Sequence, residues 1–392
     1  MTVALELYRS VPKYLAARTL GTKLPGLLAG PVASLRLVTL EERERPAAGW
    51  ARIKPSLSGI CGSDIATISG RSSFYFTALV SLPFVPGHEV VGTLSDDVDG
   101  LAAGQRVIID PVLSCVPRGV EPACGPCAEG APALCERVTG GHVSAGLQTG
   151  YCHDTSGGWS ESMVAHRAQL HPIPDDMDAP TAIMVEPMAC AIHAVRRATV
   201  PRDATVLVVG AGTVGLLTLI ALREHSEAGE IIVAAKHPRQ VELAKHFGAT
   251  EVIDPGDALG AVRRATRAFR LHPERSSPFL LGGVDVSFEC VGSKSGLDLA
   301  LRTTRARGRV VLSGMPARAD LTPAWFRELE LVGAYSGAGC FDDAMAIAAD
   351  AKLGDLVGAT YPLDRWREAI DHALSAGKLG TIKVAFDPTM EN

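Results

Sequence analysis

"VVGAGTVG", residues 208–215, is the stretch that decides the fold of this 392-residue chain. It ends a β-branched run and opens a leucine-rich segment. With this glycine spacing the first glycine makes a tight turn, the second lets the backbone approach a pyrophosphate, and the third allows a helix to pack closely on a strand. The N-terminus of that helix offers unpaired N–H groups to the phosphates. The turn residues predicted to contact a dinucleotide are Gly210, Ala211, Gly212, Thr213, Val214 and Gly215.

Strand-like and helix-like segments alternate from this turn onward. This alternation predicts a parallel, doubly wound sheet in a dinucleotide-binding domain of residues 188–334, with a surface insertion at 272–283. The uncharged run 204–222 approaches the length of a membrane span, but its glycines indicate a buried strand, turn and helix instead. The strand candidates are 205–210, 230–235, 250–254, 284–290, 308–314 and 329–333, and the helical stretches are 215–224, 239–247, 258–270 and 295–304.

The composition is that of a globular protein, with 47% hydrophobic and 21% charged residues. The formal charge is 38 − 43 = −5, and no long run of one sign occurs, which argues against a nucleic-acid partner or a membrane surface. The nine cysteines are clustered, and charged residues interrupt the N-terminal segment. We therefore expect a reducing, cytoplasmic location, in which clustered cysteines serve metal binding or catalysis rather than disulfides.

The end of strand 230–235 bears on the choice of dinucleotide. A carboxylate about 20 residues beyond the glycines would bind the adenosine ribose of NAD. Ala235 stands there instead, and Lys236, His237 and Arg239 follow it. A small residue followed by cations suits a 2′-phosphate, so the sequence favours NADP(H) over NAD(H). The other interpretation is a solvated basic turn.

Four cysteines lie within "CVPRGVEPACGPCAEGAPALC", residues 115–135. Two residues separate Cys124 from Cys127, which lets both sulfurs face one ion, and Cys115 and Cys135 would complete a closed tetrahedral zinc site. Eight residues separate Cys115 from Cys124, so Glu121 is the alternative fourth ligand.

"PGHEVVG", residues 86–92, places His88 and Glu89 at the start of an apolar strand, where burial of charged groups is costly. Cys61 lies upstream, and Glu186 opens an apolar helix downstream. Thiolate, imidazole and carboxylate are ligands that suit Zn²⁺ and can leave one position open for an alcohol or carbonyl oxygen. Each residue alone has a plainer structural role. Their combination with the dinucleotide turn and the cysteine cluster favours a catalytic zinc site.

These motifs resemble the zinc-dependent medium-chain dehydrogenase/reductase superfamily, with its alcohol, polyol and threonine dehydrogenases. The resemblance rests on the ordered series "GICGSD", "PGHEVVG", "GGWSESMVAH", "VEPMACAIHA", "VVGAGTVG", "VSFECVG" and "GRVVLSG". It implies a mostly-β, GroES-like catalytic domain of residues 1–187 and 335–392 beside the Rossmann domain. It further implies hydride transfer between NADP(H) and a primary or secondary alcohol or polyol and its aldehyde or ketone.

Residue roles follow from the same resemblance. Cys61, His88 and Glu89 would hold the catalytic zinc, with Glu186 as an alternative or exchanging ligand. Asp64 would orient His88 from behind, and Ser63 would take the alcohol proton and pass it to the nicotinamide ribose. The nicotinamide end would be walled by Cys290, Val291 and Ser313. Cys115, Cys124, Cys127 and Cys135 would hold a structural zinc. Such proteins form homodimers or homotetramers, for which residues 329–333 are a plausible edge strand.

Three features depart from the family pattern. Ala66 stands where many alcohol dehydrogenases end a proton relay with histidine, Cys115 is displaced, and Ala235 replaces the NAD-selecting acid. In addition, the stretch 1–31 is longer than a typical first strand and has no assigned role. For the substrate, Glu186 favours a polyol, whereas Phe74, Tyr75, Phe76 and Phe84 suggest a partly apolar pocket. A zinc-free quinone or enoyl reductase and a non-catalytic cofactor-binding descendant are the alternatives.

Overall fold

The computed structural model describes residues 1–21, 24–30, 32–314, 318–337 and 339–390. The chain divides into two compact units, Met1–Glu186 with Phe341–Asn392, and Pro187–Cys340. The predicted boundaries had been placed after residues 187 and 334. None of the described helices has both the length and the apolar character that crossing a membrane requires.

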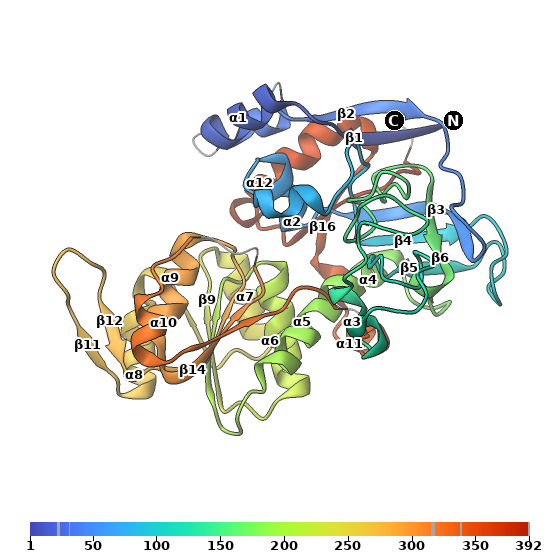
Figure 1. Cartoon of the computed structure of the whole chain (residues 1–392). Coiled ribbons are helices and arrows are strands. Elements are labelled where there is room, and N and C mark those ends of the chain that lie inside the picture. The colour runs from blue at the N-terminus through green and yellow to red at the C-terminus, as the bar shows by residue number, and fades with distance from the viewer. Residues whose placement is uncertain (22–23, 31, 315–317, 338, 391–392) are drawn as a thin grey trace. The chain divides into compact units, whose positions relative to one another are not determined.

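The first unit is built on a seven-stranded sheet (Figure 1). Its strand order is β16-β17-β3-β4-β5-β7, with β6 paired to β3, and every pair except β16–β17 is antiparallel. The middle strands bring together segments from the two ends of the chain, because β17 pairs with β3. The strands of this sheet are β3 (Trp50–Gly59), β4 (Val90–Leu94), β5 (Arg106–Ile109), β6 (Met163–His166), β7 (Leu170–Pro172), β16 (Val357–Tyr361) and β17 (Lys383–Phe386).

Short helices connect these strands and cover the sheet. They are α2 (Gly62–Ile68), α3 (Gly125–Ala128), α4 (Ala179–Ile183), α11 (Phe341–Asp350) and α12 (Trp366–Leu379), with 3-10 turns at Phe74–Ala78, Pro132–Leu134, Arg167–Gln169, Leu353–Leu356 and Leu363–Arg365. Between β5 and β6 the chain runs from 110 to 162 with only α3 and one 3-10 turn, and this region carries the four clustered cysteines.

The N-terminal residues, which the sequence left without a role, form an antiparallel pair of strands, β1 (Thr2–Leu7) and β2 (Leu35–Leu40). Between them lie α1 (Val11–Leu20) and the 3-10 turn Pro25–Ala29. Backbone hydrogen bonds of 2.8 and 3.1 Å join Leu7 to Phe84. The ring of Tyr14 packs on Phe74 at 5.3 Å, and the Arg18 guanidinium donates to the Gly70 carbonyl at 3.2 Å.

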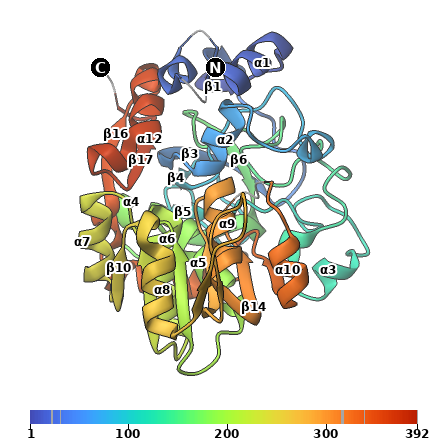
Figure 2. The same ribbon diagram turned by 90° about the vertical axis from the view of Figure 1, so that its left-hand side faces the viewer.

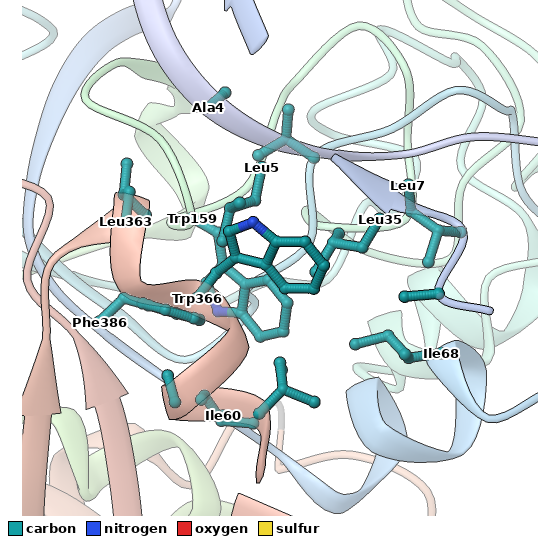
Figure 3. Close-up of a cluster of buried hydrophobic side chains, with 14 of the residues drawn as sticks. Ala4, Leu5, Leu7, Leu35, Ile60, Ile68, Trp159, Leu363, Trp366 and Phe386 are labelled. Carbon is teal, nitrogen blue, oxygen red and sulfur yellow. The ribbon is translucent and has the colours of Figure 1, made fainter. Parts of the chain in front are cut away.

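This segment contributes to the main hydrophobic core of the first unit, drawn in Figure 3. Leu5 and Leu7 of β1 pack with the indoles of Trp159 and Trp366. Burial of each such side chain contributes about 1.5–3 kcal/mol. Ile60, which directly precedes Cys61, belongs to the same core, so the N-terminal segment helps to fix the backbone from which Cys61 projects.

The second unit is the predicted parallel, doubly wound sheet, with strand order β10-β9-β8-β13-β14-β15. Helices cover both faces, with α6 contacting α7, and α9 contacting α8 and α10 (Figure 2). The strands are β8 (Thr205–Val209), β9 (Glu230–Ala234), β10 (Glu251–Ile253), β13 (Val284–Glu289), β14 (Thr304–Leu312) and β15 (Glu330–Gly333); the helices are α6 (Thr213–His225), α7 (Pro238–His246), α8 (Ala258–Thr266), α9 (Lys294–Thr303) and α10 (Thr322–Arg327), and most of α5 (Val185–Ala198) also belongs here.

All six predicted strands of this unit are confirmed, but one predicted helix was too long. Helix α8 ends at Thr266, because Arg267 adopts a left-handed conformation with φ = 55°. The chain then forms an antiparallel hairpin of β11 (Phe269–Leu271) and β12 (Phe279–Leu281) in place of the helical residues 267–270 and most of the predicted insertion.

Candidate functional site

Three neighbouring strands of the first unit have ends that bring together residues far apart in the sequence. Strand β17 pairs with β3, and β3 pairs with β4. Cys61 follows β3 by two residues, His88 and Glu89 directly precede β4, and Lys383 begins β17. The backbone N–H of Gly59 donates to the Glu89 carbonyl at 2.9 Å, which holds these segments in register.

Cys61, His88 and Glu89 form what we call the mixed cluster, because a thiol, an imidazole and a carboxylate converge there. Their ligand atoms all lie within 4.8 Å of one another. His88 and Glu89 are buried and Cys61 is half-buried. This donor set and spacing could hold a zinc ion with a position left for another ligand. Glu186 is also buried but stands outside the cluster.

Asp64 supports the mixed cluster from behind. One of its carboxylate oxygens accepts the Cys61 backbone N–H at 3.0 Å, and the other lies 3.6 Å from His88 Nδ1. Tyr151, which the sequence did not single out, donates its hydroxyl to the latter oxygen at 3.4 Å and packs on the His88 ring. Burial lowers the pKa of His88, but the negative charges of Asp64 and Cys61 outweigh it and raise this pKa well above its usual value.

Lys383 is, with Tyr151, a residue of this region that sequence reasoning missed. It is 2% exposed, and its ammonium forms an ion pair with the Glu89 carboxylate. Burial lowers the pKa of Lys383, but the negative charges of Glu89, Cys61 and Glu186 outweigh it and raise the pKa. No local signal marks it, because Ile382, Lys383 and Val384 alternate as in a half-exposed strand whose lysine faces water.

Ser63, in the first turn of α2, has a buried hydroxyl that makes no hydrogen bond to any other described residue. Buried hydroxyls normally have a partner, so this oxygen can serve a bound molecule. Of the aromatic residues that suggested an apolar pocket, only Phe84 is excluded by its place in the core, whereas Phe74 and Tyr75 are exposed and Phe76 packs on Tyr75. Phe74 also packs on Tyr14.

The second metal-binding candidate, which we call the four-cysteine cluster, comprises Cys115, Cys124, Cys127 and Cys135. The Cys135 sulfur lies 3.7 Å from that of Cys115 and 3.9 Å from that of Cys124. Sulfurs each about 2.3 Å from one tetrahedral ion would be about 3.8 Å apart, so the cluster fits zinc. Glu121, the alternative ligand, is exposed and stands outside the cluster.

Backbone N–H groups face these sulfurs. Those of Cys124, Glu136 and Arg137 donate to the sulfurs of Cys115, Cys124 and Cys135 at 3.4, 3.4 and 3.3 Å, and the N–H of Glu136 is the largest cause of a lowered pKa at Cys124. Such bonds favour thiolates, the form that binds metal.

Arg118, also missed from sequence, organises the loop around the four-cysteine cluster. Its side chain is fully buried and donates to backbone carbonyls rather than to a carboxylate. The bonds are 3.0 Å to Leu113, 2.8 Å to Gly140, 2.9 Å to Val143 and 2.6 Å to Gly146, with a longer one to Ser144. A region with little secondary structure thereby satisfies backbone groups that would otherwise be buried without partners.

In the second unit, the glycine turn lies directly after β8, and Gly210 has φ = 97°. A Cβ on Gly215 would lie 1.8 Å from the Gly210 carbonyl oxygen, so only glycine permits this packing of helix on turn. Gly212 caps α6, whose N-terminus is open to an anion. Cys290 and Val291 follow the neighbouring strand β13, and Ser313 follows β14.

A cavity of about 530 Å³ opens beside the end of β9. Lys236 and His237 line it, as does Lys245, which was not predicted, whereas Glu242 and Asp254 contribute carboxylates. Arg239 is not among its lining residues, and its guanidinium donates to Glu242 at 2.8 Å. Three basic side chains and two carboxylates therefore line this cavity.

Both family models that match this chain describe dehydrogenases, and relatives found by sequence and by structure are also dehydrogenases. Residues 47–175 match the alcohol dehydrogenase GroES-like domain, and residues 213–350 match the zinc-binding dehydrogenase family. The chain is 31% identical to L-idonate 5-dehydrogenase of Vitis vinifera, over 79% of this chain and 80% of that protein. It is also 31% identical to sorbitol dehydrogenase of Arabidopsis thaliana, over 72% and 73%.

Among solved structures, a zinc-binding dehydrogenase from Sinorhizobium meliloti bound to NADP aligns with a TM-score of 0.72 and 25% identity over 99% of both chains. The (2R,3R)-butanediol dehydrogenase of Bacillus subtilis also aligns with a TM-score of 0.72, at 22% identity, which reflects a shared fold.

Proposed function

Because the chain belongs to the zinc-dependent medium-chain dehydrogenases and is an NAD(P)-dependent alcohol dehydrogenase, we propose that it oxidises one hydroxyl of a polyol, or reduces the matching carbonyl, with NADP(H). The observation that carries this proposal is the convergence of Cys61, His88 and Glu89 beside Ser63. Two relatives named for idonate and sorbitol act on polyhydroxylated compounds, which supports a polyol. The core position of Phe84 removes one argument for an apolar pocket.

In this proposal Cys61, His88 and Glu89 hold the catalytic zinc, with Glu186 available as a further carboxylate. A zinc ion at such a site supplies Lewis acidity, which favours the alkoxide form of an alcohol and polarises a carbonyl. The four cysteines hold a structural zinc. Both assignments are tested by metal content, since two zinc ions per chain are expected by mass spectrometry of the purified protein.

Side chains of the protein orient the metal-binding histidine and move the substrate proton. Asp64 holds the His88 imidazole in one orientation, as carboxylates behind metal-binding histidines commonly do. Ser63 relays the proton: its oxygen accepts the proton of the substrate hydroxyl and its own proton passes on toward the nicotinamide ribose. Its buried oxygen makes no hydrogen bond to another described residue and so is available for this contact. A dinucleotide bound at the glycine turn would supply the hydride acceptor for the carbinol carbon.

The preference for NADP(H) rests on the end of β9. Ala235 leaves room where NAD-binding proteins carry an acid, and Lys236, His237 and Lys245 face the adjacent cavity. A 2′-phosphate carries about −1.5 to −2 charge at neutral pH and gains from such cations. An Ala235→Asp variant should lose NADP use and gain NAD use, measured as the ratio of kcat/KM values. An unchanged ratio would contradict this preference.

The substrate class is tested with a panel of alcohols and carbonyls, followed by nicotinamide absorbance with both dinucleotides. We expect sorbitol, arabinitol or related polyols to give a kcat/KM at least tenfold above those of simple primary alcohols of similar length. A protein that reduces quinones or enoyl compounds without zinc, or that binds the dinucleotide and turns over nothing, would overturn the proposal.

We further propose a homodimer or homotetramer that pairs through β15, the edge strand of the sheet in the second unit. Edge strands carry unpaired N–H and C=O groups that a second copy can satisfy. A reducing, cytoplasmic location is part of the same proposal, because clustered thiols remain available to zinc there. Light scattering on the purified protein tests the oligomeric state.

A further inference from the structure

Glu289 is a buried carboxylate that the proposed chemistry does not use. It ends β13 and is 2% exposed. Its side chain accepts backbone N–H groups of the following loop, from Val291 at 3.0 Å and from Gly292 at 3.0 and 3.1 Å. Its backbone carbonyl accepts the N–H groups of Ser313 and Gly314 at 3.1 and 2.8 Å. One residue therefore ties together the loops that follow β13 and β14.

These loops lie at the point where a doubly wound sheet binds ligands. The strand order reverses between β8 and β13, and ligands bind in the crevice outside the carboxyl ends of the strands there. Glu289 is paired with Val209, the residue before Gly210 of the glycine turn. A Cβ on Gly210 would lie 2.5 Å from Val291, so the loop that Glu289 holds contacts the turn directly.

Two glycines leave room for the Glu289 carboxylate. A Cβ on Gly296 or Gly314 would lie 2.5 or 2.8 Å from its oxygens, so both positions leave room for it. Burial raises the pKa of Glu289, and the N–H groups of Gly292, Val291 and Ser293 oppose that effect. Within the described residues no cation forms an ion pair with it, and its partners are backbone N–H groups.

We propose that Glu289 is a positioning residue for the nicotinamide half of the dinucleotide. Its carboxylate fixes residues 290–293, and its carbonyl fixes Ser313 and Gly314, so that these two segments are preformed before the dinucleotide binds. Preformed loops bind more tightly because less ordering entropy is lost on binding. This inference rests on dinucleotide binding at the glycine turn, and adds a residue that does not itself contact the reacting atoms.

The test compares two ligands that differ only at the nicotinamide end. NADPH reaches the loops held by Glu289, whereas 2′-phospho-ADP-ribose lacks the nicotinamide and contacts only the rest of the site. We expect Glu289→Gln, which keeps the volume but places an amide against an N–H group, to raise the Kd of NADPH about tenfold by calorimetry. The Kd of 2′-phospho-ADP-ribose should change less than twofold.

Glu230→Gln is the matched control, because Glu230 is an exposed glutamate at the opposite end of a strand in the same sheet and should leave both Kd values unchanged. A general loss of stability would weaken both ligands together. If the ratio of the NADPH Kd to the 2′-phospho-ADP-ribose Kd is the same in wild type and Glu289→Gln, the inference is overturned. Wild-type protein that binds neither these two ligands nor NADH would instead refute the dinucleotide site itself.

Discussion

The four-cysteine cluster and the mixed cluster both gather metal-binding side chains in the first unit, but their surroundings differ. The four-cysteine cluster lies in a long region with little secondary structure, and Arg118 satisfies its backbone carbonyls. The mixed cluster lies at the ends of β3 and β4, with a buried lysine beside its carboxylate. One site thus depends on a loop closed around sulfur, and the other on a sheet that already exists.

This difference indicates separate roles. Four thiolates at tetrahedral spacing leave no position open, so a metal there can contribute to folding but has no position for a substrate. The mixed cluster has three ligand types, a nearby hydroxyl without a partner, and a structure maintained by strand pairing. The Cys61 thiol can therefore be removed from the mixed cluster with little loss of fold, whereas removal of a sulfur from the four-cysteine cluster should destabilise the protein.

The largest expected effect is on activity. Cys61→Ala should lower kcat/KM at least about a thousandfold, because the metal that polarises the substrate oxygen loses a thiolate. The zinc content should fall from two ions to one, and Tm should change by only a few degrees. Loss of activity with a large fall in Tm would show that the mixed cluster is structural.

Cys135→Ser should have the opposite profile. Structural zinc binding is folding free energy, so loss of one sulfur should cost several kcal/mol, or roughly 10 °C in Tm. The protein that remains folded at low temperature should keep most of its kcat/KM. A variant with wild-type Tm and one zinc lost would contradict the proposed role of the four-cysteine cluster.

Lys383→Met tests whether the mixed cluster depends on its buried cation. The substitution leaves the Glu89 carboxylate buried without its partner, which costs about 3–5 kcal/mol in comparable cases. Glu89→Gln combined with Lys383→Met should recover much of this loss, measured by urea unfolding of the zinc-loaded proteins. If Lys383→Met is as stable as wild type, the metal alone compensates the negative charge of Glu89, and the mixed cluster does not depend on the lysine.

The sequence predicted the second unit in most detail because each strand and helix there is a local pattern. Glycine spacing, strand alternation and the ends of β8, β9 and β13 are all readable within 10 residues or so. The partners of the site were not readable in this way. Lys383 lies 294 residues from Glu89 and reaches it only because β17 pairs with β3. Arg118 is read from sequence as a surface cation, since nothing local shows that carbonyls surround it.

Asp110, a half-buried carboxylate, provides the smallest expected effect and sharpens the comparison with the buried carboxylate of Glu89. It precedes the region of the four-cysteine cluster, forms no ion pair with a described residue, and accepts one N–H, that of Val112, at 3.1 Å. Burial raises its pKa to about 6. Because the folded-state pKa is higher than the ordinary value, the folded protein favours the protonated form, and this stability is lost as the pH rises from about 4 through about 6.

Asp110→Asn should therefore be more stable than wild type at pH 8, by on the order of 1–3 kcal/mol, and the difference should shrink toward pH 5. The asparagine keeps an acceptor for Val112 but carries no charge at any pH. Thermal unfolding of both proteins between pH 5 and 8 measures the trend, and a difference independent of pH would rule out ionisation of Asp110 as its cause. A carboxylate without a cation should thus favour its neutral form, whereas Glu89 beside Lys383 has a partner for its charge.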